Sequence, residues 1–448
     1  MGEMKKFLIM TLLFMLPLAS ASQLEFYPNE NAFEEFLSDG RTYHVVSGES
    51  DYSKAWGWYV DEKLSRFKDK GDEVLVLVGN VYDNPEMKKL WNLTGLPPEA
   101  SLEPSVIVLN GVVLFTGSEG NMYLIEKAFS SHYRFRSAEV YGLLFAGIFL
   151  VLFFAFWFSN HGTYTHFFYL LVVSLLAFWV SNSMPFTIGE DFLKNTFQSA
   201  LMETKDSLLS LALNSYFQVY SPTEEALLVL HLFILFFTST LIFFTAPKPY
   251  RELGFLVFGL MFSSPSFRNS IADFSTNIGV FLLVLVAALT LNAKFTEGSP
   301  KVMGQVFLLS LVVAAGSLVW PYLIVFPFFT FFVFPTKSIR NSIYLGLSIT
   351  FFILGANVFS IPEISLSFDP GSLFVFLREG ILQLILISYL LFDFRRSILN
   401  MRGGKALFFW LLVIFVPLSA CSPQLFPMVQ YISSALAVRL ICELTPQT

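Results

Sequence analysis

The pattern of hydrophobic positions changes near residue 136 and divides the chain in two. Residues 22–135 alternate short apolar stretches with polar ones, as in a small folded domain. Residues 136–448 gather their apolar positions in long runs with few charges, which is typical of membrane-spanning helices. The runs cover about 138–158, 165–184, 224–245, 252–265, 274–293, 303–319, 321–335, 341–360, 372–392, 406–421 and 424–442.

The charges between these runs predict the direction of each crossing. If the first run passes from outside to inside, the connections after the third, fifth, seventh and ninth runs are cytoplasmic. These connections are basic and the outer connections are acidic, as the positive-inside rule requires. The basic residues are Lys248, Arg251, Lys294, Lys301, Lys337, Arg340, Arg395, Arg396, Arg402 and Lys405, and the acidic ones are Glu190, Asp191, Glu203, Asp206, Glu363 and Asp369.

The stretch 303–335 decides the number of crossings. Basic connections flank it on both sides, so it must cross an even number of times. Trp320-Pro321 marks the expected turn, because proline disfavours helix in the residue before it. We therefore predict a polytopic α-helical membrane protein of about 11 transmembrane helices with a cytoplasmic C-terminus.

The N-terminus predicts that residues 22–135 lie outside. Lys5 and Lys6 precede an apolar stretch, and Ala19-Ser20-Ala21 has the small residues of a cleavage site, so residues 1–21 are typical of a signal peptide. An uncleaved signal anchor is the alternative, with the same topology. We expect a multi-pass protein of the cell membrane.

Composition agrees with a membrane protein and narrows its partners. The chain is 54% hydrophobic and 14% charged, against about 25% charged residues in soluble domains. A net charge of -6 and the lack of a basic stripe argue against a nucleic-acid partner. The two cysteines, Cys421 and Cys442, lie in the last apolar runs, so the outer domain has neither a disulfide nor a cysteine-based metal site.

The outer domain shows an alternation of strands and helices. Asp83-Asn84-Pro85 begins a helix with proline in its first turn. Asn110-Gly111 between two alternating apolar runs predicts a hairpin. The expected order is a strand at 41–47, a helix at 54–70, a strand at 73–79, a short helix through Trp91, the hairpin, and a helix at about 121–130.

This order resembles the thioredoxin fold. DNPEMKKLWNL followed by EPSVIVLNGVVLFTG is similar to the segment in which a helix leads to a cis-proline and a hairpin, and the resemblance covers most of residues 40–130. It implies that Pro104 replaces the cis-proline and contacts an extended peptide. Thioredoxins carry Cys-x-x-Cys after the first of these strands, whereas this chain has Ser47 to Ser53 there. Without a thiolate, disulfide exchange is excluded.

Two roles for a redox-inactive domain remain open. It binds or scaffolds a protein partner through residues 23–135, or it only packs on the membrane part. Asn92-Leu93-Thr94 is a glycosylation sequon, and such triplets are frequent by chance.

Three groups of ionisable residues interrupt the apolar part, and such residues are costly unless they serve a function. Each group also has a structural interpretation: a solvated acidic loop, a helix cap with an ion pair, and a buried ion pair that stabilises helix packing. The groups are Glu190-Asp191, Arg268 with Asp273, and Arg378-Glu379.

Residues 165–335 weakly resemble the type-C glycosyltransferase fold, whose members use lipid-phosphate-linked sugars. In that fold an outward helix leads to a long loop that begins with an acidic residue, a second helix returns, and a third rises to a short outer loop with arginine and aspartate. The corresponding segments here are 165–184, the loop with GEDF, 224–245, 252–265 and PSFRNSIADF.

PSFRNSIADF also resembles a stretch of the oligosaccharyltransferase catalytic subunit, with Arg268, Ser270 and Ala272 in register. The acidic pair of that family is replaced by Thr276 and Ile278, so this metal-binding element is missing. The family's outer C-terminal domain and its Trp-Trp-Asp motif are absent as well.

The resemblance implies a chemistry for the ionisable groups. Asp191 or Glu190 would act as general base on an acceptor hydroxyl. Arg268 and Arg378 would bind the lipid phosphate and stabilise the charge of the leaving group. No cofactor and no metal site are evident, although a divalent metal with few ligands is compatible with this chemistry. The orienting residues would be Asp273 and Glu379.

Three functions remain open. The first is a membrane glycosyltransferase, active or degenerate, that acts at the outer leaflet on a polyprenyl-phosphate-linked sugar. The second is a non-catalytic scaffold or partner-recruiting subunit. The third is a transporter, because proline and glycine breaks near 265, 316–321 and 370 could interrupt helices.

Overall fold

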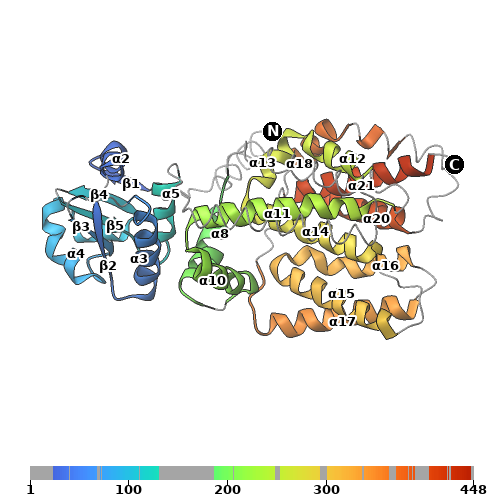
Figure 1. Cartoon of the computed structure of the whole chain (residues 1–448), viewed down its shortest axis with the longest axis horizontal. Helices are drawn as coiled ribbons and strands as arrows, with labels where there is room; N and C mark the ends of the chain where they lie inside the picture. Colours follow the sequence, from blue (N-terminus) through green and yellow to red (C-terminus); the bar gives the residue numbers. More distant parts are fainter. Residues whose placement is uncertain are drawn as a thin grey trace, which may run out of the picture. The chain divides into compact units, whose positions relative to one another are not determined.

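The chain folds into two compact units, Met1–Arg134 and Phe135–Thr448 (Figure 1). The computed structural model describes residues 24–39, 41–67, 71, 73–109, 111–130, 186–204, 206–247, 253–292, 300–334, 338–362, 370–381, 383–385, 387–388, 403–420, 422 and 425–444. The predicted signal peptide and the first two apolar runs, 138–158 and 165–184, lie outside these residues.

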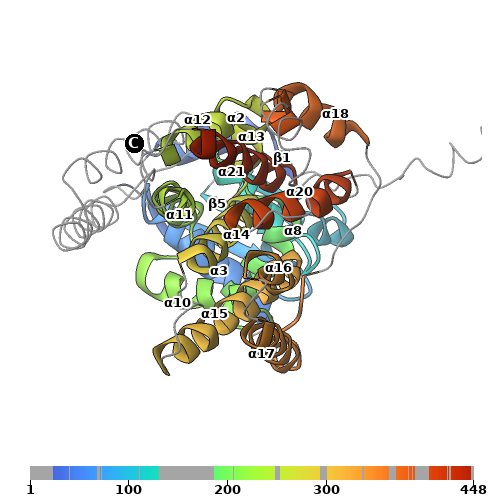
Figure 2. The ribbon, with the colours of Figure 1, turned by 90° about the vertical axis from the view of Figure 1, so that its right-hand side faces the viewer.

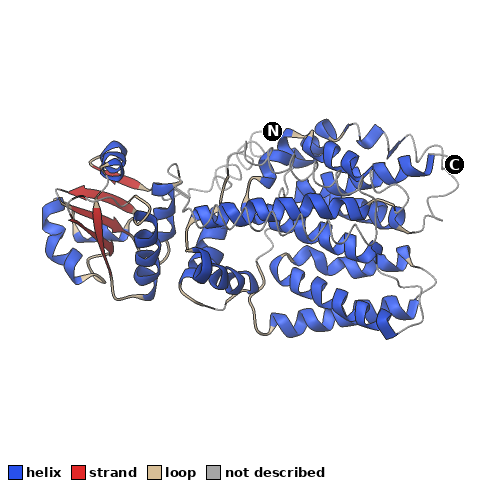
Figure 3. Ribbon diagram, in the orientation of Figure 1, coloured by secondary structure: helices blue, strands red, loops and turns tan. Residues whose placement is uncertain are grey.

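The first unit is built on a five-stranded mixed sheet of order β1-β4-β5-β3-β2 (Figure 3). Strands β2, β3 and β5 run parallel to one another, and β4 and β1 run in the opposite direction. The hairpin at Gly111 joins β4 to β5, with Leu109 paired to Val112. The strands are β1 (Glu25–Tyr27), β2 (Thr42–Ser47), β3 (Glu73–Gly79), β4 (Ser105–Leu109) and β5 (Val112–Thr116).

Helices cover both faces of this sheet because the strands alternate buried side chains between them. On one face Leu77 and Leu114 pack with Met87 and Trp91. On the other face Phe115 stacks on Phe129, which also contacts Phe33 and Tyr59. The helical elements are α2 (Glu30–Ser38), α3 (Asp51–Leu64), α4 (Pro85–Leu90), η1 (Trp91–Thr94), η2 (Pro98–Leu102), η3 (Met122–Ile125) and α5 (Glu126–Phe129).

The predicted strands and helices of this unit are present in a mixed α/β sheet domain, and the resemblance to the thioredoxin fold stays a prediction. Here β4 lies between β1 and β5, and β5 joins the parallel strands through β3. The described residues contain one cis peptide bond, Tyr27-Pro28, so the bond before Pro104 is trans. Strand β1 and helix α2 were not predicted.

The second unit is helical throughout its described residues. Helix α11 begins at Glu224 and ends at Thr245, as the apolar run predicts, and α14 and α17 likewise follow their runs. The long connection after residue 185 also folds into short helices. The elements are α8 (Glu190–Phe192), η4 (Leu193–Phe197), α9 (Gln198–Leu201), α10 (Leu208–Tyr220), α11 (Glu224–Thr245), α12 (Gly254–Phe262), α13 (Pro265–Ile271), α14 (Phe274–Asn292), α15 (Pro300–Val319), η6 (Pro321–Val325), α16 (Phe326–Val333), α17 (Ser338–Ala356), α18 (Pro370–Glu379), α20 (Gly404–Ser419) and α21 (Phe426–Leu444).

Three described helices, not about eleven, are long and apolar enough to cross a membrane: Glu224–Thr245, Phe274–Asn292 and Ile339–Ala356. The expected number was too high because several runs fold as short helices. Residues 252–265 give only the nine residues of α12, about 14 Å of helix against a hydrocarbon core of about 30 Å. The three helices indicate a membrane protein; the predicted orientation stays a prediction.

The predicted turn at Trp320-Pro321 is confirmed. Helix α15 ends at Val319, Trp320 is extended, and η6 begins at Pro321. The helices on either side of the turn therefore do not form one continuous rod.

The helical unit has a buried core and an apolar exterior. Figure 2 looks along the unit, where α15 lies beside α17, α11 beside α14, and α20 beside α21. Only 17% of the apolar window in Ile339–Ala356 is buried, and Ile353 and Leu354 are more than half exposed. Such a surface is costly in water and suits contact with lipid.

Candidate functional site

The three predicted groups of ionisable residues lie on the short helix α13 or on segments hydrogen-bonded at its two ends. Ser264 is its N-cap and accepts a hydrogen bond from the Phe267 amide at 3.0 Å. Pro265 follows at the first helical position, where its missing N–H costs nothing. The helix ends at Ile271, next to Asp273. Seven residues do not make a stable helix alone, so α13 depends on contacts from elsewhere.

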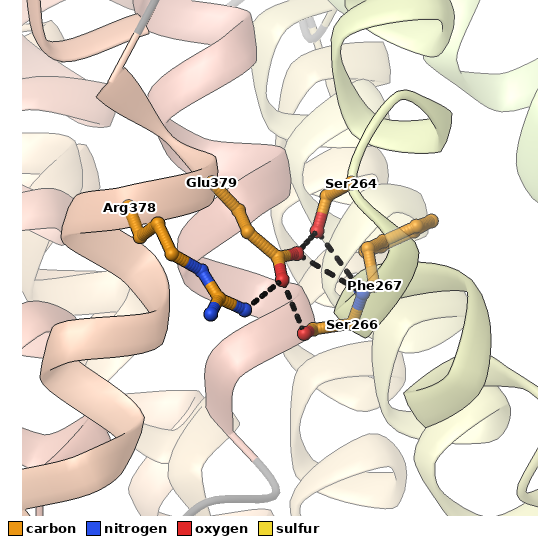
Figure 4. A network of polar contacts seen from close by, with 5 residues as sticks. All are labelled: Ser264, Ser266, Phe267, Arg378 and Glu379. Carbon is orange, nitrogen blue, oxygen red and sulfur yellow. Dashed lines mark hydrogen bonds and ion pairs between the residues drawn. The ribbon is translucent and has the colours of Figure 1, made fainter.

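The Glu379 carboxylate closes the N-terminal end of α13 (Figure 4). It accepts hydrogen bonds from the Ser264 hydroxyl at 2.5 Å, the Ser266 hydroxyl at 2.7 Å and the Ser266 amide at 3.0 Å. Arg378 Nη2 lies 3.0 Å from Glu379 Oε1, the oxygen that also accepts the Ser266 hydroxyl. The Glu379 side chain is 9% exposed, whereas that of Arg378 is 76% exposed. Glu379 thus supplies acceptors for a helix N-terminus 113 residues earlier.

These contacts fix the charge of Glu379, which lies outside the three candidate membrane spans. Burial alone would raise the pKa of this carboxyl, but the hydrogen bonds from Ser264, Ser266 and Arg378 outweigh burial and lower the pKa to about 2. Glu379 is therefore ionised at neutral pH, and all its acceptor positions face protein donors. It is suited to holding structure and poorly suited to exchanging protons.

Asp273 performs a related task at the other end of α13. Its carboxylate accepts hydrogen bonds from the Thr276 amide and hydroxyl, both at 2.9 Å, which caps α14. It also accepts the Gly189 amide at 3.1 Å, and Thr187 forms a bridge with Asp273 through backbone bonds. Asp273, one of the two predicted orienting residues, thus holds the segment that leads into Glu190 and Asp191.

The predicted base and phosphate-binding residues are exposed around this centre. Glu190 and Asp191 begin α8, directly after Gly189, and both are exposed. Arg268 is exposed on α13, and its side chain makes no hydrogen bond or ion pair within the described residues. Arg378 reaches α13 through Glu379. From Ser264 to Asp273 the chain advances about 13 Å at 1.5 Å per residue, so the two tethered ends of α13 are neighbours.

Sequence reasoning missed a buried polar pair beneath this centre. Asn277 donates from its amide nitrogen to His231 Nδ1 and to the His231 carbonyl, both at 3.2 Å, and links α14 to α11. Both side chains are buried, and their hydrogen bonds satisfy polar groups inside the helical unit. Asn277 follows Asp273 by one helical turn, a spacing that could have suggested a shared face.

The start of α11 carries two further residues that the sequence reasoning passed over. Glu224 and Glu225 are fully buried at the N-terminus of a candidate membrane span. Carboxylates are favourable at that end of a helix, because the helix dipole and free N–H groups face them.

Within the described residues, no three His, Cys, Asp or Glu side chains are placed to hold a metal ion.

In the α/β unit, Asp83 closes the edge where the parallel strands β2, β3 and β5 end. Ligands of open α/β sheets bind at such an edge. Here the Asp83 carboxylate accepts the Ser50 amide at 2.6 Å, the Ser50 hydroxyl at 2.9 Å and the Ser53 hydroxyl. Both serines lie in the stretch where the thioredoxin resemblance would need cysteines. The carboxylate therefore occupies the N-terminus of α3.

Pro104 is also engaged within the unit. It is buried, and its carbonyl accepts the Glu25 amide at 3.1 Å. Strand β1 of the same chain thus lies along β4. The contact of Pro104 with an extended peptide stays a prediction.

No protein-family model, curated protein or solved structure matches the chain.

Proposed function

We propose that the helical unit binds the phosphate of a polyprenyl-phosphate-linked sugar at the face of α13 and transfers the sugar to an acceptor hydroxyl. One observation carries this proposal: an exposed guanidinium group lies on α13 itself, and a second exposed guanidinium group and two exposed carboxylates lie on segments that are hydrogen-bonded at the two ends of α13. A phosphate and an acceptor hydroxyl need these two kinds of groups.

Each residue has a role in this proposal. Arg268 and Arg378 bind the phosphate, since exposed guanidinium groups are strong donors to phosphate oxygens. Asp191, with Glu190 beside it, accepts the proton of the acceptor hydroxyl. Asp273 and Glu379 act as positioning residues, since the first holds the segment before α8 and the second carries Arg378 beside α13. The expected orientation places this site at the outer leaflet.

The test is transfer of labelled hexose from a polyprenyl-phosphate hexose by the full chain in lipid nanodiscs. Asp191→Asn should abolish transfer, because the amide cannot accept the proton. The matched control is Asp206→Asn, which removes an exposed carboxylate later in the same connection. Unchanged transfer by the Asp191 variant would remove that residue from the role of base.

Phosphate binding is tested separately from transfer. Arg268→Ala and Arg378→Ala should each weaken retention of the lipid phosphate about tenfold, the loss of one to two charge-assisted hydrogen bonds. Lys194→Ala, which removes an exposed cation that is not on α13, should leave retention unchanged. Equal binding by all three variants would contradict the proposed phosphate site.

A second candidate function, a non-catalytic partner-recruiting subunit, is favoured by a different observation. The carboxylates of Glu379 and Asp273 accept hydrogen bonds from groups of the protein itself, as expected of residues that hold structure. This candidate predicts that the full chain, cross-linked in its native membrane, is joined to the same protein whether or not Asp191 is replaced. Absence of any cross-linked partner would count against it.

A further inference from the structure

The α/β unit carries a surface feature that the function proposed for the helical unit does not use. The triplet Asn92-Leu93-Thr94 lies in the short helix η1, and no other Asn-x-Ser or Asn-x-Thr triplet occurs in the chain. The helix ends at Thr94, and its C-cap Gly95 has a positive φ of 70° that turns the chain away. The triplet thus sits in a tight surface turn of the kind in which modified asparagines occur.

The turn is anchored from beneath and displays its asparagine outward. Trp91 is buried, and its indole N–H donates to the carbonyls of Leu96 and Pro97 at 3.0 and 3.2 Å. Thr94 donates to the Trp91 carbonyl at 2.7 Å and accepts the Leu96 amide at 3.1 Å. The Asn92 side chain is exposed and makes no hydrogen bond within the described residues.

The residue between them is unusual for a surface turn. Leu93 is 68% exposed, although leucine gains about 1.5–3 kcal/mol when it is buried. Asn92 and Leu93 are thus both exposed, so the structure leaves room for a modification on Asn92.

We propose that Asn92 is the acceptor of an N-linked glycan. In the modification the Asn92 amide nitrogen bonds to the anomeric carbon of an oligosaccharide carried on a polyprenyl diphosphate. The bond between that carbon and the diphosphate oxygen breaks, its electron pair leaves with the polyprenyl diphosphate, and the amide nitrogen loses one proton. The proposal requires that the α/β unit lie outside, and it is independent of the function proposed for the helical unit.

The experiment expresses the full chain in cultured human cells and compares its electrophoretic mobility in the membrane fraction before and after treatment with peptide N-glycosidase. The wild-type chain should shift once to higher mobility. Asn92→Gln and Thr94→Ala should run at the treated position without the enzyme. Thr94→Ser, which keeps the hydroxyl of the triplet, should still shift.

Two controls make the result decisive. Asn31→Gln removes another exposed asparagine of the same unit, outside any triplet, and should retain the shift. Asn92→Gln removes a side chain that makes no hydrogen bond within the described residues, so loss of its shift would not reflect misfolding. A membrane-resident wild-type chain that the enzyme leaves unchanged, or an Asn92→Gln variant that still shifts, would overturn the proposal.

Discussion

Asp83 in the α/β unit and Glu379 in the helical unit solve the same problem with nearly the same contacts. Each carboxylate comes from a distant segment, accepts one backbone amide and two serine hydroxyls, and fills the N-terminus of a helix. An anion is favoured there because the helix presents free N–H groups and a positive dipole end. The two units thus use internal carboxylates where other proteins bind ligands.

The two carboxylates differ in their neighbouring residues and in the length of the helix that each one caps. The Asp83 carboxylate fills the edge where the parallel strands end. Helix α3 is long enough that other contacts also stabilise it. Glu379 carries the exposed Arg378 beside it and holds a helix of only seven residues. The same kind of carboxylate cap therefore fills a potential ligand site in the α/β unit, whereas in the helical unit it holds together the elements of a potential ligand site.

The largest expected effect is from Glu379→Ala. Ser264 and Ser266 would lose their acceptor, and the loss of several hydrogen bonds to a charged group should reduce the free energy of unfolding of the helical unit by about 3 kcal/mol. Thermal unfolding of the full chain in detergent measures the change, and hydrogen exchange should rise in residues 264–272. Arg378→Ala is the control, because an exposed ion pair contributes less than about 1 kcal/mol; an equal loss in both variants would contradict the capping role.

In the α/β unit, Gly48→Ala tests whether Asp83 caps helix α3. A β-carbon at Gly48 would overlap the Asp83 carboxylate and push it from Ser50 and Ser53. We expect a loss of about 2 kcal/mol from overpacking and from the weakened cap, with faster hydrogen exchange at the start of α3. Gly120→Ala, where nothing lies near the added carbon, should be neutral. Wild-type exchange in the Gly48 variant would show that Asp83 is not essential to the cap.

A smaller effect is expected from Asp273→Asn. The amide can still accept a hydrogen bond at the start of α14, but it loses the charge that favours the Gly189 and Thr276 amides. The expected cost is about 1 kcal/mol. Hydrogen exchange should increase in residues 187–191 and remain unchanged around Glu379. Increased exchange at both ends of α13 would mean that the two ends are coupled rather than separately held.

The last prediction concerns how the charge of Glu379 makes the stability of the helical unit depend on pH. The effect is the smallest near neutral pH and becomes large in acid. Its pKa falls from the ordinary 4.5 to about 2 on folding. A carboxyl with a depressed pKa contributes its stability above the unfolded pKa and loses it as the pH falls toward the folded pKa. Unfolding followed between pH 5 and 2 should show this loss in the wild type and a smaller one in Glu379→Gln. Identical pH profiles would exclude Glu379 as a source of acid sensitivity.

Much of the local structure could be predicted from the sequence. The hairpin at Gly111, the helix start at Asn84-Pro85 and the extent of α11 follow from turn chemistry, capping and apolar periodicity, which act over a few residues. The order of the sheet could not be predicted in the same way. The succession of strands along the chain leaves open whether β4 or β5 pairs with the parallel strands, and the pairing of β1 with β4 depends on residues about 80 positions apart.

The candidate site shows the same limit. The sequence singled out Asp273, Arg378 and Glu379 because charges are rare in apolar segments. It did not indicate that Glu379 would bind Ser264 and Ser266, because serines are common and nothing local marks them as partners. The buried pair of His231 and Asn277 was missed for the same reason. Partners more than 40 residues apart are defined by packing rather than by spacing.

The dependence of α13 on distant segments has a consequence for the order in which the chain matures. Gly189 is synthesised 84 residues before Asp273, but Glu379 follows Ser266 by 113 residues. A ribosome releases this later segment only after α14, α15 and α17 have left the exit tunnel. Helix α13 can therefore be completed only after Glu379 has left the ribosome, so a chain truncated before Glu379 should be recognised by quality control as unfinished even if its candidate membrane spans have already been inserted.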